Sequence, residues 1–185
     1  MQIRELGPGR RDGDRLVAEL VRLLDESGVA LGALAALVVA RGPGSFTGLR
    51  SGIAAAQGLA RATGVSLVGI DSLELTARAI EGAPGERIAP LAAGRGGRVY
   101  GALFEIVGAG AVWLIEPVAE RTFARWRERC PPATRFVLAG AAVPEIAHCE
   151  SPPRSARLQA AVRFAVTATA SAPSELHPLY VRDWM

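Results

Sequence analysis

The sequence predicts an α/β protein with a helix-covered parallel sheet, followed by antiparallel strands. In the first half, helical patterns alternate with short uninterrupted apolar runs, which is typical of a buried parallel sheet. After residue 86 the strand patterns follow one another directly, with glycine-rich turns between them, which favours hairpins. The composition changes at residues 82–86, so we expect a first lobe over residues 1–82 and a second lobe over residues 83–185.

Three helical patterns and two apolar runs make up the first half. The first helix is expected to begin at Asp12 or Asp14 and to end before Gly28. The runs at 34–40 and 65–70 predict strands buried on both faces. The other two helices are expected at 45–63, capped by Ser45 and ended by Gly64, and at 72–80, capped by Ser72.

The second half predicts mainly strands. A tail over residues 177–185 is aromatic and apolar, so we expect it to dock back on the body. Strands are expected at 87–93, 98–107, 111–118 and 135–140, and helices at 119–129 and 155–169.

The bulk composition limits the class of protein. The chain has 185 residues, of which half are hydrophobic and 5% are aromatic, so Ala, Val, Leu and Ile must form most of the core. No apolar run reaches the roughly 20 residues of a membrane span, and no secretory leader is visible, so we expect a cytoplasmic protein without a membrane contact. Every basic residue is Arg, and the net charge is only +3, which is weak evidence for a nucleic-acid partner.

A glycine-rich turn, "GPGSFTGLR", occupies residues 42–50, between a predicted strand and a predicted helix. It is not a P-loop, because that motif needs a lysine and this chain has none. It fits a dinucleotide-binding turn poorly, because Pro43 removes a backbone donor. An anion at the helix start near Ser45 and Thr47 stays an alternative. The helix-start turn comprises Gly42, Pro43, Gly44, Ser45, Thr47 and Arg50, and Arg50 could pair with an acidic group.

Packing is the favoured explanation for these glycines. Gly44, Gly48, Gly52 and Ala56 follow one another at intervals of four residues, so one face of the helix is nearly bare. Glycine inside a helix costs about 1 kcal/mol relative to alanine. We therefore expect this bare face to let a neighbouring backbone approach closely.

The remaining reactive side chains do not form a recognisable catalytic set. The two histidines, His148 and His177, are far apart in the sequence, so no metal site is expected. Cys130 and Cys149 are expected to be inert thiols. Asp71 is expected to cap a helix or to interact with its dipole rather than to act as an acid. The arginine-rich segment 121–129 is expected to be a solvated helix face, with a polyanion contact as the alternative.

Four segments, in order along the chain, resemble the TsaB (YeaZ) family. The most specific is "RGPGSFTGLRSGIAAAQGLA" at 41–60. The others are "VSLVGIDSLELTA" at 65–77, "GRGGRVYGALFE" at 94–105 and "HPLYVRD" at 177–183. This resemblance implies an actin-like (ASKHA, ribonuclease H-like) fold with two lobes.

The resemblance also implies a function. Members of this family are non-catalytic subunits of the machinery that adds threonylcarbamoyl to the adenosine 3′ of the anticodon in tRNA. They bind a catalytic TsaD-type subunit through two helices of the first lobe, a TsaE-type ATPase joins the assembly, and alone they form homodimers through the same surface. No catalytic residue, metal or cofactor is implied here, and tRNA contact is expected to be indirect. The corresponding helices span 14–27 and 45–63, with the partner interface expected at Leu16, Leu20, Leu23, Leu24, Gly48, Gly52 and Ala56.

One departure from the family concerns the N-terminus. Family members begin with a strand, a phosphate-contacting turn and a hairpin, whereas this chain matches only from the last of these strands onward, so its first lobe is expected to lack N-terminal strands. Either the true start lies upstream or the chain is truncated, and nucleotide binding is not expected. The alternatives are a peptidase-like or transferase enzyme of the same superfold, or a truncated relic without partner binding.

Overall fold

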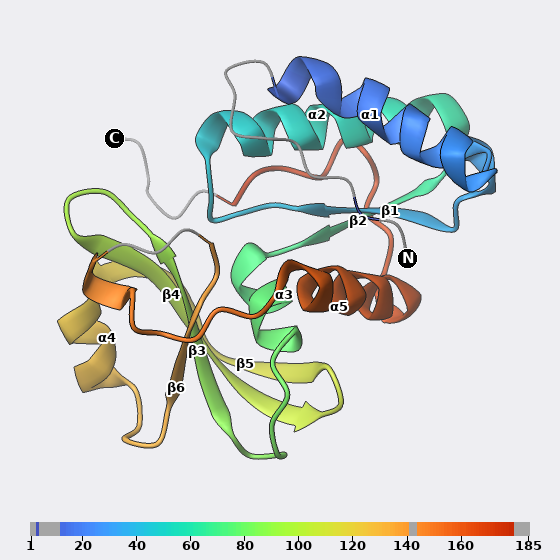
Figure 1. The fold of residues 1–185 in the computed structure, drawn as a ribbon. Helices are drawn as coiled ribbons and strands as arrows, with labels where there is room; N and C mark the ends of the chain where they lie inside the picture. Colours follow the sequence, from blue (N-terminus) through green and yellow to red (C-terminus); the bar gives the residue numbers. More distant parts are fainter. Residues whose placement is uncertain (1–2, 4–11, 141–143, 180–185) are drawn as a thin grey trace.

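The computed structural model describes residue 3 and the ranges 12–140 and 144–179. Figure 1 shows two sheets with separate helical coverings, and α3 and α5 lie between them. Helix-covered parallel strands come first, and antiparallel strands follow, so the predicted α/β class is confirmed. The division at residues 82 and 83 stays a prediction.

The first sheet contains two described strands, β1 (Ala36–Ala40) and β2 (Ser66–Ile70), which pair in parallel with Val38 opposite Val68. Two helices, α1 (Asp12–Ser27) and α2 (Phe46–Thr63), lie on one side of it, and α5 (Arg154–Thr167) lies on the other (Figure 1). Ile53 and Ala60 of α2 pack on Leu67 of β2 to form the core of this region.

The boundaries of α1 and α2 match the predicted ones. Ser45 caps α2, because its hydroxyl accepts a hydrogen bond from the Gly48 N–H at 3.3 Å. Gly64 ends the helix in the left-handed conformation, with φ of 74°. The predicted capping side chains Asp12 and Asp14 lie outside the described side chains.

The prediction that both first-lobe strands are buried on both faces is wrong for β1. All five of its residues are half-buried, whereas Leu67, Val68 and Ile70 of β2 are buried. The difference arises because β2 has neighbours on both sides. Ser171 donates its N–H to the carbonyl of Leu67 at 2.8 Å, while β1 pairs only with β2 in the described part of the chain.

Helix α3 (Ser72–Arg78) follows β2 directly. Of the two predicted caps, Ser72 and Asp71, it is Asp71 that lies at the N-cap position, but its side chain makes no capping hydrogen bond. Its carboxylate instead binds the Arg41 guanidinium at 2.7 Å. A long-range ion pair has therefore replaced the local cap that the sequence suggested.

The second sheet has four strands in the order β5-β4-β3-β6. β3 pairs antiparallel with β4 and parallel with β6, and β4 pairs antiparallel with β5. Helix α4 (Phe123–Arg129) covers one face through the fully buried Trp126. The strands are β3 (Arg87–Ala93), β4 (Arg98–Gly108), β5 (Ala111–Thr122) and β6 (Arg135–Leu138).

The helix predicted at 119–129 begins four residues later than expected, at Phe123. Residues 119–122 continue β5, because Ala119 lies opposite Gly101 and Thr122 lies opposite Arg98 in the antiparallel ladder. Thr122 then caps α4 by accepting the Arg125 N–H at 3.3 Å. Two single-turn helices, η1 (Leu31–Ala33) and η2 (Pro144–Ile146), complete the described elements.

The chain returns to the first sheet at its C-terminal end. Gln57 of α2 donates to the carbonyls of Pro173, at 2.6 Å, and Leu176, at 2.9 Å. Leu176 is buried, and the Leu179 N–H donates to the carbonyl of Arg41 at 2.8 Å. The expected docking of the tail is thus seen up to Leu179, and residues 180–185 lie outside the described part.

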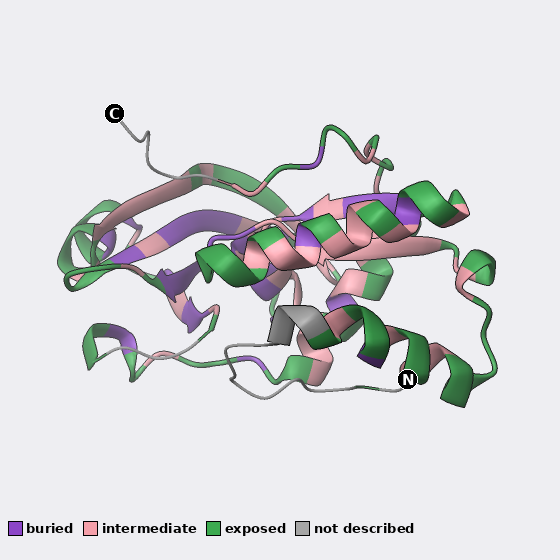
Figure 2. Ribbon diagram, turned by 90° about the horizontal axis from the view of Figure 1, so that it is seen from above, coloured by how far each residue is buried: buried purple, intermediate pink, exposed green. Residues whose placement is uncertain are grey.

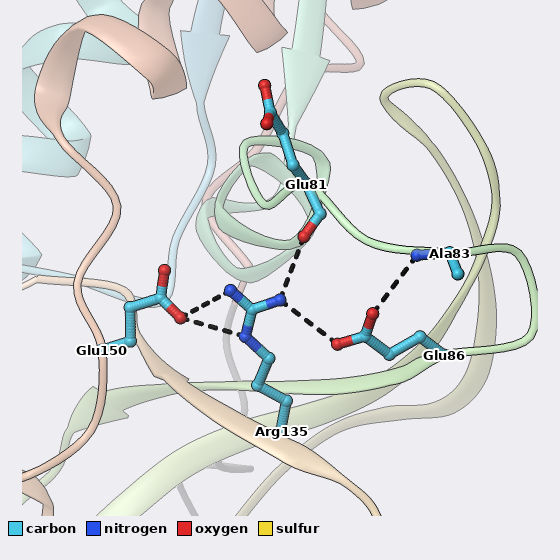
Figure 3. Close-up of polar contacts among 5 residues, drawn as sticks. All are labelled: Glu81, Ala83, Glu86, Arg135 and Glu150. Atoms are coloured by element: carbon cyan, nitrogen blue, oxygen red, sulfur yellow. Dashed lines mark hydrogen bonds and ion pairs between the residues drawn. The ribbon is translucent and has the colours of Figure 1, made fainter.

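A polar cluster around Arg135 holds the segment that joins α3 to β3 (Figure 3). Arg135 binds Glu150 through two nitrogens, at 2.7 and 3.0 Å, and donates to Glu86 at 3.2 Å and to the carbonyl of Glu81 at 3.0 Å. Glu86 in turn accepts the Ala83 N–H at 3.3 Å. These hydrogen bonds, above all those with Glu150, raise the pKa of Arg135. The cluster therefore fixes the joining segment against β6.

We expect Arg135→Met to lower the free energy of unfolding by about 1 kcal/mol, since it removes charge-assisted bonds that are partly screened by solvent. Urea denaturation would measure the change. Arg125→Met is the matched control, because Arg125 forms one exposed pair with Glu128 and its loss should cost less than about 0.5 kcal/mol. Equal effects of the two substitutions would contradict a stabilising role for the polar cluster around Arg135.

Candidate partner interface on helices α1 and α2

The glycine-rich turn is held against the end of β2. The Ser72 N–H donates to the carbonyl of Gly42 at 2.7 Å, and the Arg41 N–H donates to the carbonyl of Ile70 at 2.9 Å. Gly42 has φ of 115°, which disfavours any residue with a side chain. Gly42 and Pro43 are buried, whereas Gly44, Ser45 and Thr47 are exposed. The turn therefore sets the start of α2 and leaves that start open to solvent.

The described residues at the start of α2 do not form a dedicated anion-binding site. The Gly48 N–H, one of the free donors that an anion would use, already donates to Ser45. The Arg50 guanidinium lies over the Phe46 ring, 4.2 Å from its centroid. The geometry here favours a helix start over a phosphate site.

The prediction of a close approach along the whole glycine stripe is wrong within this chain. A Cβ added at Gly48 would meet only the Cβ and Oγ of Ser45, at 3.5 Å, and one added at Gly52 would meet Val39 at 4.0 Å. These are ordinary contact distances. Ala56 packs against the core of the first sheet, so the C-terminal end of the stripe faces the protein interior. Of the four positions in the stripe, only Gly44 and Gly48 are exposed, so only this end of the bare face is accessible to solvent.

Two close approaches that the sequence did not reveal occur elsewhere. An added Cβ at Gly69 of β2 would overlap Leu176 and would lie 2.7 Å from Cδ of Arg41. An added Cβ at Gly101 of β4 would lie 2.5 Å from Cε2 of Trp126. A single glycine inside a strand pattern was the available signal for both positions.

The predicted leucines of α1 lie on one side of that helix. Leu16, Leu20, Leu23 and Leu24 are all half-buried. Figure 2 shows α1 beside α2, with an exposed outer side and a half-buried inner side. Glu19 is buried between two arginines, with Arg22 at 3.0 Å and Arg15 at 3.5 Å. The two helices thus present an apolar, partly covered surface that carries a compensated carboxylate.

Further apolar side chains extend this surface. Val17, Val21 and Phe46 are exposed, at 39%, 42% and 49%. Val17 and Val21 belong to α1, like the four leucines, and Phe46 is the first residue of α2. We name Leu16, Leu20, Leu23, Leu24 and Gly48 the helix-pair face. Whether it binds a partner stays a prediction, as does the role of Gly52 and Ala56.

A pocket of about 270 Å³ lies between α3, the β4–β5 hairpin and the C-terminal segment. Two carboxylates face it, and both are already paired: Asp71 with Arg41 at 2.7 Å and Glu74 with Arg78 at 2.8 Å. Its other lining residues are apolar: Phe104, Val112, Leu114, Pro117, Val118 and Leu179. No pattern in the sequence had indicated it, because its walls come from segments far apart in the chain.

The thiols and histidines are not assembled into a reactive group. Burial raises the pKa of Cys130, which sits in the core beside Trp126, and it also raises the pKa of the half-buried Cys149. The His148 ring contacts Phe123, with centroids 5.5 Å apart. Within the described ranges, no three His, Cys, Asp or Glu side chains are grouped so that they could hold a metal ion. No helix in those ranges is long and apolar enough to cross a membrane.

A parallel sheet between helices, joined to a second, mixed sheet, places this chain among two-lobed actin-like proteins. The family model described as TsaD, tRNA N6-adenosine threonylcarbamoyltransferase, matches residues 10–126, which is more than half of the chain. The chain therefore belongs to this family. Its relatives include TsaB (YeaZ) proteins, as the sequence resemblance had indicated.

Three comparisons support this placement. The chain is 42% identical over 69 residues to the tRNA threonylcarbamoyladenosine biosynthesis protein TsaB of Escherichia coli, covering 37% of this chain and 29% of that protein. It is 33% identical over 119 residues to TsaB of Bacillus subtilis, covering 63% of this chain and half of that protein. The solved structure of YeaZ from Pseudomonas aeruginosa superposes with a TM-score of 0.72 at 26% identity, covering 95% of this chain and 86% of that one. The actin-like fold class is thus confirmed, and the matched segments span half or less of these two curated relatives.

Proposed function

We propose that this chain is a non-catalytic subunit in tRNA threonylcarbamoyladenosine biosynthesis, and that it acts by binding a TsaD-type catalytic subunit. The names of the E. coli and B. subtilis relatives support the pathway. In this proposal the protein works in the cytoplasm, a TsaE-type ATPase joins the assembly, and tRNA is contacted through the partner.

The observation that carries the proposal is the helix-pair face. Its four leucines are neither fully buried in this chain nor fully exposed, so a second protein could remove more of their surface from water. Each square ångström of apolar surface that is buried contributes about 25 cal/mol. Gly48 adds a position without a side chain, where a partner backbone could approach the helix.

The ion pairs in the pocket support an accessory role. An acid–base catalyst needs a carboxylate that is free to exchange a proton. Asp71 and Glu74 each hold an arginine instead. The Asp71 pair ties the start of α3 to Arg41, whereas the Glu74 pair lies within α3, where Arg78 also donates to the carbonyl of Gly110 at 3.1 Å. In this proposal the Asp71–Arg41 pair holds the segment between β1 and α2 against the start of α3.

Light scattering after size-exclusion chromatography tests the proposal directly. The chain is mixed with the TsaD-type protein of the same organism, and we expect a one-to-one complex. Two separate peaks at all concentrations would contradict the proposal and would favour a relic without partner binding.

Gly48→Ala should weaken that complex about tenfold, because the new methyl group keeps the partner backbone away from α2. The matched control is Gly58→Ala on the same helix, where an added Cβ meets nothing within 4 Å. Both substitutions should increase helix stability, by up to about 1 kcal/mol. Titration calorimetry measures the affinities, and equal affinities for the two variants would exclude a role for Gly48 in the interface.

A further inference from the structure

The pocket beside α3 lies next to the point where the described chain ends. Leu179, the last described residue, forms part of the pocket wall together with Phe104 of β4 and Val118 of β5. Residues 180–185, "YVRDWM", follow it directly in the sequence. Whatever path these residues take, they therefore begin at the wall of this pocket.

Hydrogen bonds and burial fix this starting point. The Leu179 N–H donates to the carbonyl of Arg41 at 2.8 Å, and Leu176, just before it, is buried in the core of the first sheet. Gln57 of α2 donates to the carbonyl of Leu176 at 2.9 Å. An extended chain advances by at most about 3.5 Å per residue, so residues 180–185 stay within about 20 Å of this anchor. The tether keeps the effective concentration of these residues at the pocket high.

The apolar part of the pocket matches the composition of residues 180–185. An apolar cavity of about 150 Å³ is large enough to bind benzene, so this pocket of about 270 Å³ can take an aromatic side chain. Leu114 of β5, which belongs to the wall, is 50% exposed, so contact with further apolar groups would remove more of its surface from water. Most of the segment is apolar or aromatic: Tyr180, Val181, Trp184 and Met185.

The polar part of the pocket suits the one cation of the same segment. Asp71 binds Arg41 through Oδ1, and Glu74 binds Arg78 through Oε1. Among the described residues, Oδ2 of Asp71 and Oε2 of Glu74 accept no hydrogen bond. Both oxygens remain as acceptors for a guanidinium, and the segment carries one at Arg182.

We propose that residues 180–185 fold back into this pocket and close it. Their aromatic and aliphatic side chains pack on the apolar wall, and Arg182 donates to the remaining oxygens of Asp71 and Glu74. The pocket is then an internal docking site for the chain's own residues. This proposal does not depend on the proposed function, because neither the pocket nor the segment belongs to the helix-pair face.

Acrylamide quenching of tryptophan fluorescence tests the docking in the full chain. Trp113, which is 70% exposed, is first replaced by Phe, so that emission comes from the fully buried Trp126 and from Trp184. In this background we expect a Stern–Volmer constant at least threefold below that of the same chain in urea.

A charge on the pocket wall should release the segment. Leu114→Glu, in the same background, should raise the Stern–Volmer constant at least twofold, because the carboxylate would have to be buried against the docked side chains. Leu158→Glu is the matched control, because Leu158 is similarly exposed, at 41%, and lies on α5 outside the pocket. It should leave the constant unchanged, and circular dichroism checks that both variants are folded.

Digestion with carboxypeptidase Y follows the same segment without a fluorophore. We expect Met185 and Trp184 to be released at least fivefold more slowly from the wild-type chain than from Leu114→Glu. Arg182→Gln, a change in the segment itself, should raise the release rate about twofold.

Three results would overturn the proposal. Rapid release from the wild-type chain, or strong quenching of Trp184 in it, would leave the pocket to a separate ligand. Release rates that neither Leu114→Glu nor Arg182→Gln changes would place the segment elsewhere. Equal changes in Leu114→Glu and Leu158→Glu would show a general loosening of the fold.

Discussion

Gly101→Ala should lower the free energy of unfolding by about 3 kcal/mol, at the upper end of the usual cost of overpacking a core. The new methyl group would lie 2.5 to 2.8 Å from three atoms of the Trp126 indole. The ring cannot move away, because it is fully buried, packs with Leu91 and Leu103, and lies under the Arg121 guanidinium, 4.7 Å from the centroid. For a chain of this length the change corresponds to a drop in Tm of roughly 6–12 °C.

Gly108→Ala is the control for that measurement. Gly108 ends the same strand, and an added Cβ there meets nothing within 4 Å. Its substitution should change stability by less than about 0.5 kcal/mol. If thermal and urea unfolding give similar losses for both variants, the cost arises from strand conformation and not from the contact with Trp126.

Leu20→Glu should abolish the complex with a TsaD-type protein, with an affinity loss of at least a hundredfold. In the complex the new carboxylate would be buried without a partner, which costs several kcal/mol. In the free chain Leu20 is only half-buried, so the charge can reach water and the helix should persist. Titration calorimetry gives the affinity, and circular dichroism with thermal unfolding reports on the fold.

Ala18→Glu provides the matched change on α1. Ala18 is exposed and lies two residues from Leu20, on roughly the opposite side of the helix. The substitution introduces the same charge into the same helix, and it should leave the affinity for the TsaD-type protein within about twofold. Loss of binding in both variants would assign the effect to overall charge, and unfolding of Leu20→Glu alone would mean that the leucines serve only the core of this chain.

The elements that the sequence predicted well are those with strong local signals. Helix α2 begins after Ser45 and ends at Gly64 as expected, because capping and left-handed termination depend on neighbouring residues. The β3–β4 hairpin also follows from its glycine-rich turn, where Gly96 and Gly97 have positive φ. The start of α4 was wrong because residues 119–122 have a partner, β4, that lies far back in the sequence.

The candidate surface was predicted only in part. The leucines of α1 follow the helical period, and their half-buried state agrees with that period. The stripe on α2 was also a helical pattern, but its orientation depends on the sheet beneath it. Ala56 turned out to face the core, and Gly48 to face solvent.

The sequence by itself determined the α/β class, the termini of α1 and α2 and the family resemblance, since each depends on residues that are close together in the chain or on a linear motif. Tertiary structure decided which glycines are true close contacts, that Asp71 pairs with Arg41, and that the edge of β2 is covered at Leu67 by Ser171. These outcomes depend on contacts between segments tens of residues apart. Local preference contributes only tenths of a kcal/mol per residue, so long-range packing overrides it wherever the two disagree.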